Sequence, residues 1–192
     1  MQRAFIVRPF NMKKDSSGKE VDFERTHQEL IAPALEVAGL GGGTTGKIID
    51  AGNIREDMFG LIIEADLVLC DITVHNANVF YELGIRHALR KKGTVLIKGA
   101  PVADSTPFDI LTDRYLEYNV DKPGEKKDEL VDVIRATLAS QRETDSPIFK
   151  MLPTLPELDP RRCRLCPQIS PRRWRAPRPP SPPAGCASWR RK

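Results

Sequence analysis

The sequence lacks any continuous apolar run long enough to cross a bilayer. Its first residues, MQRAFIVRPF, also lack the long apolar segment and small-residue cleavage site that mark a signal peptide. The sequence also lacks a complete phosphate-binding loop of the kind that holds ATP. In the segment Thr44–Lys47 (TTGK), Ile48 follows the lysine where a phosphate-binding loop needs Ser or Thr. We therefore expect a cytoplasmic protein with neither a membrane span nor a nucleoside-triphosphatase loop.

Acidic side chains are missing from residues 161–192, which carry nine Arg, one Lys, seven of the 16 prolines and three of the four cysteines. Removing those ten basic residues leaves 20 basic against 26 acidic residues in residues 1–160. The overall charge of +4 thus averages a body near −6 and a tail near +10. A Pro- and Arg-rich segment buries too little apolar surface to offset its ordering entropy, so we expect the tail to be disordered.

Two interpretations of this tail stay open. In the first it is a native basic arm, which binds nucleic acid weakly and without sequence preference. In the second it is the product of out-of-frame translation of a GC-rich gene, which its composition resembles. Cys163 and Cys166 have the spacing of zinc ligands, but one pair without a histidine in the tail is a weak signal. We predict no metal and no cofactor.

Residues 1–160 suit a single domain in which apolar runs alternate with amphipathic patterns. The runs predict buried strands over residues 4–10, 66–73 and 93–99, and an edge strand over 114–120. The amphipathic patterns predict helices over residues 22–40, 53–65, 78–91 and 126–142. This alternation favours an α/β fold: a doubly wound, mostly parallel five-stranded, flavodoxin-like sheet with helices on both faces.

Some segments are harder to assign. Residues 11–22 are interpreted as a polar loop, and residues 39–52 as a degenerate second strand or a flexible loop. The first helix is expected to begin at a cap, Asp22, and to be kinked or shifted by Pro33.

Ligands of doubly wound sheets bind beyond the carboxyl ends of the strands, which here lie near Phe10, Asp71 and Lys98. In this crevice we expect Pro9 with Phe10, and also Asn76 and Asn78, which are placed to cap the helix that follows Asp71. Tyr81 and Phe10 either stack on a base or pack against the sheet.

Glu82 lies about one turn into that helix, among apolar neighbours. With Asp71 it forms a candidate catalytic pair: Glu82 attacks a sugar C1′ or stabilises an oxocarbenium ion, while Asp71 orients the sugar or moves a proton. From spacing alone, an alternative stays open in which Glu82 complements the helix dipole and Asp71 caps a loop. We also expect Cys70 to be a small buried hydrophobe and Arg86 to pair with an acid.

The segments Ala65–Thr73 (ADLVLCDIT) and Asn76–Leu89 (NANVFYELGIRHAL) resemble the nucleoside 2-deoxyribosyltransferase-like superfamily, which includes the 2′-deoxynucleoside 5′-phosphate N-hydrolases. The resemblance implies that Glu82 is the nucleophile on the deoxyribose C1′ and that Asp71 is the strand-end acid. It also implies a homo-oligomer, since a neighbouring subunit often completes the pocket in these enzymes. Asn76 stands where the transferases carry a second Asp, so that acid has no counterpart here.

A narrower resemblance, from about Arg3 to Pro160, is to bacterial proteins labelled as containing a TRAFs-binding domain. It is carried by Arg8–Phe10 (RPF, where that group has MPF), Thr106–Arg114 (TPFDILTDR) and Ser146–Leu155. The sequence departs from the group at Gly41–Gly46, where the group has a strand ending in acidic residues. It departs again in the tail, where a helical repeat region usually follows.

The expected fold is also similar to the Toll/interleukin-receptor (TIR) domain, whose enzymatic members use a helix Glu to cleave the nicotinamide–ribose bond of NAD. The sequence has no TIR-type Trp-Cys pair before Glu82, which favours the deoxyribosyltransferase side. We therefore expect an N-glycosidase or N-(deoxy)ribosyltransferase acting on a nucleotide, nucleoside or NAD-like ligand. The alternative is a non-catalytic nucleotide sensor or signalling scaffold.

Overall fold

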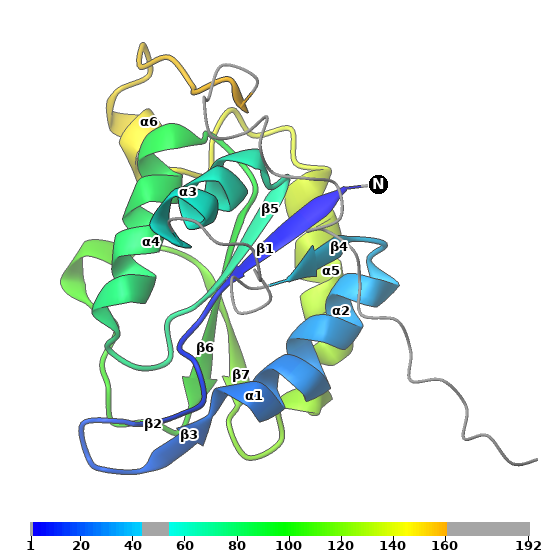
Figure 1. Ribbon diagram of the computed structural model, residues 1–192, viewed down its shortest axis with the longest axis vertical. Coiled ribbons are helices and arrows are strands. Elements are labelled where there is room, and N and C mark those ends of the chain that lie inside the picture. The colour runs from blue at the N-terminus through cyan, green and yellow to red at the C-terminus, as the bar shows by residue number, and fades with distance from the viewer. Residues whose placement is uncertain (1, 44–53, 161–192) are drawn as a thin grey trace, which may run out of the picture.

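The computed structural model describes residues 2–43 and 54–160, with the side chains of residues 54–56 excepted. The expectations for Thr44–Lys47 and for the tail lie outside these residues. Within them, one five-stranded sheet forms the centre of the molecule (Figure 1), in the order β4-β1-β5-β6-β7. Its strands are β1 (Arg3–Val7), β4 (Gly41–Gly43), β5 (Leu67–Asp71), β6 (Thr94–Ala100) and β7 (Tyr115–Asn119).

All neighbouring strands of this sheet are parallel, so the expected α/β fold is confirmed and the sheet is fully rather than mostly parallel. The glycine-rich segment contributes β4, a short edge strand, so its residues Gly41–Gly43 form a strand rather than a loop. β7 forms the other edge, as predicted. Gly42 is required where β4 meets β1, because a Cβ there would lie 2.3 Å from the carbonyl oxygen of Ala4.

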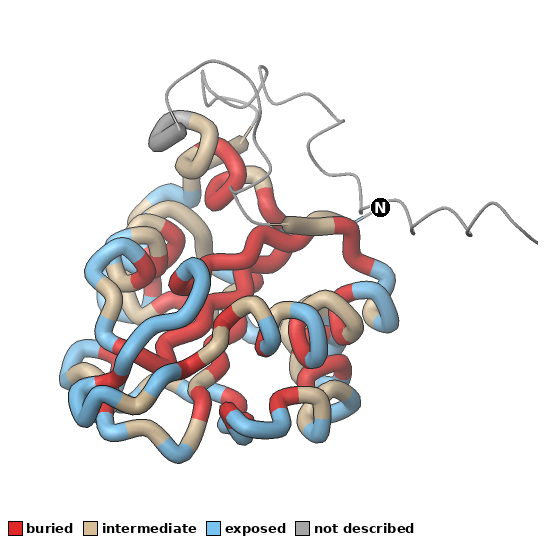
Figure 2. Tube along the Cα trace, turned by 60° about the horizontal axis from the view of Figure 1, so that its bottom comes forward, coloured by how far each residue is buried: buried red, intermediate tan, exposed pale blue. Residues whose placement is uncertain are grey.

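Alternating side chains of the strands build two apolar cores, one on each face of the sheet. In β1, Ala4 and Ile6 enter the first core, whereas Phe5 and Val7 enter the second. β5 alternates in the same way. Figure 2 shows the strands as a continuous buried centre surrounded by exposed loops and helix faces. Burial on both faces explains why the central strands read as unbroken apolar runs.

The first face is covered by α1 (Phe23–Thr26), the π-helical turn η1 (His27–Ile31), α2 (Ala32–Val37) and α5 (Lys127–Leu138). Asp22 caps α1 by accepting from the backbone N–H groups of Glu24 and Arg25, as predicted. The expected disturbance at Pro33 takes the form of η1, in which the N–H of Ala32 reaches back five residues to the carbonyl of His27. The wider turn lets the chain stay helical although Pro33 has no N–H to donate.

The second face is covered by α3 (Ile54–Glu64) and α4 (Ala77–Leu89), which pack against each other and against β1. In Figure 1 these two helices lie on one side of the sheet and α1, α2 and α5 on the other. The short turn η3 (Phe108–Ile110) adds Ile110 to the second core. The helix α6 (Pro147–Met151) packs on α4, and η4 (Pro123–Lys126) precedes α5.

The prediction of a polar loop over residues 11–22 was wrong. Two strands, β2 (Met12–Lys14) and β3 (Glu20–Asp22), form an antiparallel hairpin in this segment. Apart from Met12 and the buried Val21, their side chains are charged and show no apolar alternation, and the hairpin is held by carboxylates. Asp15 accepts from the N–H of Ala103, and Asp104 accepts from the N–H of Ser16.

Among residues 2–43 and 54–160, the helices are too short or too polar to span a membrane.

Candidate functional site

The strand ends at which the ligand crevice is predicted are those of β1 and β5. These neighbouring strands form the point at which the strand order of the sheet reverses direction, the usual ligand site of an open α/β sheet. The register pairs Val7 with Cys70, so the next residues along, Arg8 and Asp71, stand together at this end. α4 begins just beyond β5, after a five-residue connection, and brings its first turns over the same end.

Glu82 is carried by α4 and is half-buried. Its neighbours Val79 and Leu83 fix the rotation of the helix by packing into the second core. Burial raises the pKa of Glu82 to about 7. Among the described residues no side chain or N–H forms a hydrogen bond or ion pair with its carboxyl group. A desolvated carboxyl without a structural partner is available for a ligand.

Asp71, in contrast, is fully buried and has its hydrogen bonds supplied by the protein. One carboxyl oxygen accepts from the N–H of Thr73 at 3.0 Å and from the Thr73 hydroxyl, and the other accepts from the Tyr118 hydroxyl at 2.9 Å. The Thr73 hydroxyl in turn accepts from the N–H of Gly99 at 2.7 Å. Burial raises the pKa of Asp71 to about 6, although the hydrogen bonds from Thr73 and Tyr118 and the charge of Arg8 oppose that rise.

The two predicted catalytic acids approach the strand end from opposite faces of the sheet. The partner of Asp71, Tyr118, belongs to the first core, whereas α4 carries Glu82 over the second. No hydrogen bond joins the two carboxyl groups. Both nevertheless lie close enough to Cys70 to influence it: burial, then Asp71, then Glu82, raises the pKa of this thiol. Cys70 itself is fully buried, as expected for a small hydrophobe.

The start of α4 confirms one of the two predicted caps. The Asn76 side chain accepts from the N–H groups of Asn78 and Val79, at 3.1 and 3.3 Å, while Asn78 is exposed in the first turn. Tyr81 is also exposed, and its ring lies 6.1 Å from that of Phe59 on α3. It therefore does not pack against the sheet, and its exposed face is open to a ligand.

The end of β1 places the other two predicted crevice residues. Pro9 is buried, and its carbonyl accepts from Arg8 at 3.0 Å. Phe10 is 44% exposed and lies under the Arg8 guanidinium, 5.7 Å from its central carbon to the ring centroid. Asn11 follows with a positive φ of 58°, a conformation that Asn tolerates better than most residues, and turns the chain into the hairpin.

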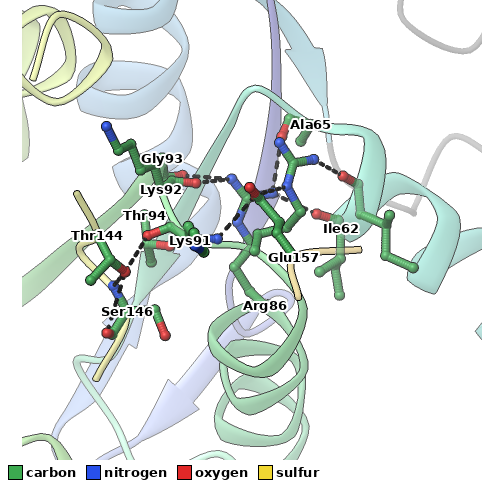
Figure 3. A network of polar contacts seen from close by, with 12 residues as sticks. Ile62, Ala65, Arg86, Lys91, Lys92, Gly93, Thr94, Thr144, Ser146 and Glu157 are labelled. Carbon is green, nitrogen blue, oxygen red and sulfur yellow. Dashed lines mark hydrogen bonds and ion pairs between the residues drawn. The ribbon is translucent and has the colours of Figure 1, made fainter. Parts of the chain in front are cut away.

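Arg86 is a residue whose role the sequence did not reveal. Instead of pairing with an acid, its fully buried guanidinium donates to four main-chain carbonyls, those of Ile62, Ala65, Lys92 and Gly93. Figure 3 shows the side chain pointing from α4 into the gap between the end of α3 and the chain before β6. One helical turn after Glu82, Arg86 thus fixes the position of α4 against both neighbours.

Asp104 is a second such residue, because it connects two loops at the rim. One of its oxygens accepts from the N–H of Ser16 in the hairpin, and the other accepts from the N–H of His75 in the loop before α4, both at 2.7 Å. The His75 ring also bonds the carbonyl of Ser105 at 2.8 Å. The partners of Asp104 lie far from it along the chain, and an acid in a loop gives no sequence signal for such contacts. Only the structure could therefore identify its role.

Within the described part of the chain, no three His, Cys, Asp or Glu side chains are grouped as metal ligands would be. A groove of about 810 Å³ lies at the other end of β6 and β7, between α5 and the segment before α6, and contains none of the predicted site residues.

Comparison with protein-family models, curated proteins and solved structures finds no match for this chain. The candidate site therefore rests on its own geometry: Glu82, half-buried and without a bonded partner among the described residues, and the fully bonded Asp71 beside Arg8 at the strand-order switch point.

Proposed function

We propose that this protein is an N-glycosidase or N-(deoxy)ribosyltransferase that acts on a nucleotide, nucleoside or NAD-like ligand through Glu82. The observation that carries the proposal is the state of Glu82. A carboxyl with a pKa raised to about 7 is partly ionised at neutral pH, and no described protein group occupies its oxygens. The resemblance of Asn76–Leu89 to deoxyribosyltransferase-like sequences supports the same role.

In the proposed reaction, a Glu82 carboxylate oxygen forms a bond to C1′ of the sugar while the bond from C1′ to the base nitrogen breaks. The electron pair of that bond leaves with the base, which takes up a proton from solvent. Water or a second base then attacks C1′ and loses a proton to solvent, while the bond from C1′ to the Glu82 oxygen breaks and restores the carboxylate. Asp71 suits a positioning role better than proton transfer, because both of its oxygens already accept hydrogen bonds from Thr73 and Tyr118.

A second candidate is a non-catalytic nucleotide sensor or scaffold. It is favoured by the separation of the two acids, since glycosidases generally use carboxyl groups that face one another across the scissile bond. Here Asp71 and Glu82 reach the crevice from opposite faces of the sheet. This candidate predicts saturable binding of a nucleotide without any turnover.

The deciding experiment incubates the purified full-length protein with deoxynucleoside monophosphates, nucleosides and NAD, and measures released base by chromatography. The proposal expects base release from at least one of these compounds, and its near-complete loss in Glu82→Gln. Asp71→Asn is expected to weaken turnover less, because Asp71 affects the reaction only by holding the strand ends in position. The catalytic proposal is disproved if no compound releases base, or if Glu82→Gln releases as much base as the parent.

A further inference from the structure

Arg8 is a buried cation at the crevice that the proposed chemistry leaves unused. Its side chain is only 3% exposed, yet it is held by few groups. One terminal nitrogen donates to the carbonyl of Pro9, the other contacts Glu24 at 2.6 Å, and Nε has no partner. A buried guanidinium normally has its donors satisfied, because leaving one without a partner is costly.

The Arg8–Glu24 pair is asymmetric. The guanidinium is enclosed by Pro9 and by the ring of Phe10, whereas the carboxyl side chain of Glu24 is 45% exposed at the start of α1. Arg8 and Asp22 provide the described contacts of this glutamate, the latter through the Glu24 backbone N–H. The cation is therefore fixed, whereas the exposed anion can rotate into solvent when another anion takes its place on Arg8.

The position of this pair matches the ligand end of the sheet. Arg8 directly follows β1 at the strand-order reversal, beside Asp71 and on the same face of the sheet as α1. Phe10, 44% exposed, offers an apolar surface next to the guanidinium. A cation, an exposed ring and a removable carboxylate thus lie together at the end of β1, and α4 brings Glu82 toward the same end from the other face of the sheet.

We propose that Arg8 is the residue that recognises an anionic group of the ligand, and that Glu24 occupies it as an exchangeable anion until the ligand binds. The ligand group is a phosphate monoester or a pyrophosphate, whose several oxygens can accept from Nε and from the terminal nitrogen that Glu24 leaves, as one carboxylate oxygen does not. The proposal rests on the proposed function for the ligand class, and it makes a nucleotide rather than a nucleoside the preferred ligand.

Calorimetric titration of the full chain with inorganic phosphate and with pyrophosphate tests this at constant ionic strength. Glu24→Gln removes the competing anion and is expected to tighten binding about tenfold, the change that one charge-assisted contact produces. Arg8→Met is expected to abolish this binding. The matched control is Glu29→Gln, which removes the carboxylate of the exposed Arg25–Glu29 pair on the same helical segment and should leave the affinity unchanged. All variants keep the same Arg-rich tail, so its contribution cancels.

Unchanged or weaker phosphate binding by Glu24→Gln overturns the proposal, and it does so even if Arg8→Met fails to fold. The catalytic proposal fails separately. If Glu24→Gln binds pyrophosphate more tightly but no compound releases base, Arg8 remains the anion-binding residue of a sensor. If base is released equally from nucleoside and nucleotide, and Arg8→Lys leaves that ratio unchanged, the role of Arg8 is refuted while catalysis stands.

Discussion

The Tyr118 hydroxyl donates a hydrogen bond of 2.9 Å to the Asp71 carboxyl, which joins the carboxyl ends of β7 and β5 across the intervening strand β6. Thr73 completes the link to β6, because its hydroxyl accepts from the N–H of Gly99. Three strand ends are thus connected through one buried carboxyl group. The acid that the sequence presents as half of a catalytic pair is, in the structure, the centre of this network.

Tyr118→Phe removes one donor from Asp71 and leaves a buried carboxyl oxygen without that bond. We expect the pKa of Asp71 to rise further above 6, because the lost bond favoured the ionised form. The free energy of unfolding should fall by about 1–3 kcal/mol at pH 8. Urea denaturation and carbon NMR titration of Asp71 measure the two effects. Tyr115→Phe, on the same strand but more exposed, is the control, and an equal loss of stability in both variants would contradict the network.

Glu82→Gln should stabilise the protein at alkaline pH. Burial raises the pKa of Glu82 from 4.5 to about 7, so between these values the folded chain holds a proton that the unfolded chain has released. The unfolding free energy therefore falls as the pH rises through this window. Gln carries no charge, so the variant should exceed the parent in Tm at pH 8, and the difference should vanish near pH 4. The raised pKa of Asp71 also makes the unfolding free energy fall with pH, in a lower pH range, but both proteins contain Asp71.

Glu36→Gln, which changes an exposed carboxyl at the end of α2, serves as the control for that experiment. It should show no gain in Tm at pH 8. If Glu82→Gln were instead less stable than the parent at pH 8, the carboxyl would be held by the protein, and its availability for a ligand would be disproved.

The sequence predicted the architecture well because burial on both faces leaves a strong signal. The apolar run ending at Asp71 is typical of a central strand, and the caps at Asp22 and Asn76 follow from local chemistry. The hairpin at residues 12–22 was missed for the opposite reason. Its strands bury little, and the acceptors that hold it, Asp15 and Asp104, act between segments that are 88 residues apart.

The sequence indicated candidate site residues but not the geometry in which the fold places them. Spacing placed Asp71 and Glu82 near one another, yet the face toward which each carboxyl points depends on pleat and helix rotation. Arg86 was expected to pair with an acid because a charged residue in a helix usually does. Its burial against four carbonyls follows from the packing of α3, α4 and β6, which no local pattern encodes.

Asp104→Asn should loosen the loop before α4. The amide retains one acceptor oxygen and turns an NH₂ group toward the other N–H, so either His75 or Ser16 loses its partner. We expect amide hydrogen exchange at His75 or Ser16 to accelerate about tenfold or more, which corresponds to the loss of one charge-assisted bond. Asp15→Asn is the control, since Asp15 binds the N–H of Ala103 and none in the loop before α4. Exchange at His75 that accelerates equally in both variants would show that Asp104 has no specific role there.

Gly93→Ala should be among the most damaging small substitutions in the protein. Gly93 has a φ of +85°, and a Cβ there would lie 2.1 Å from the carbonyl oxygen of Asp66 and 2.9 Å from an Arg86 nitrogen. Its own carbonyl accepts from Arg86 and from the N–H of Val68, so a shift to relieve the clash breaks bonds that hold α4 and β5.

Gly18 is the control, because it has a nearly equal φ of +89° but nothing within 4 Å of its Cβ position. Urea denaturation should show Gly18→Ala losing about 1–2 kcal/mol, the conformational cost alone, and Gly93→Ala losing at least about 3 kcal/mol. Equal losses would mean that the packing around Arg86 yields easily, and that the arginine does not fix the helix that carries Glu82.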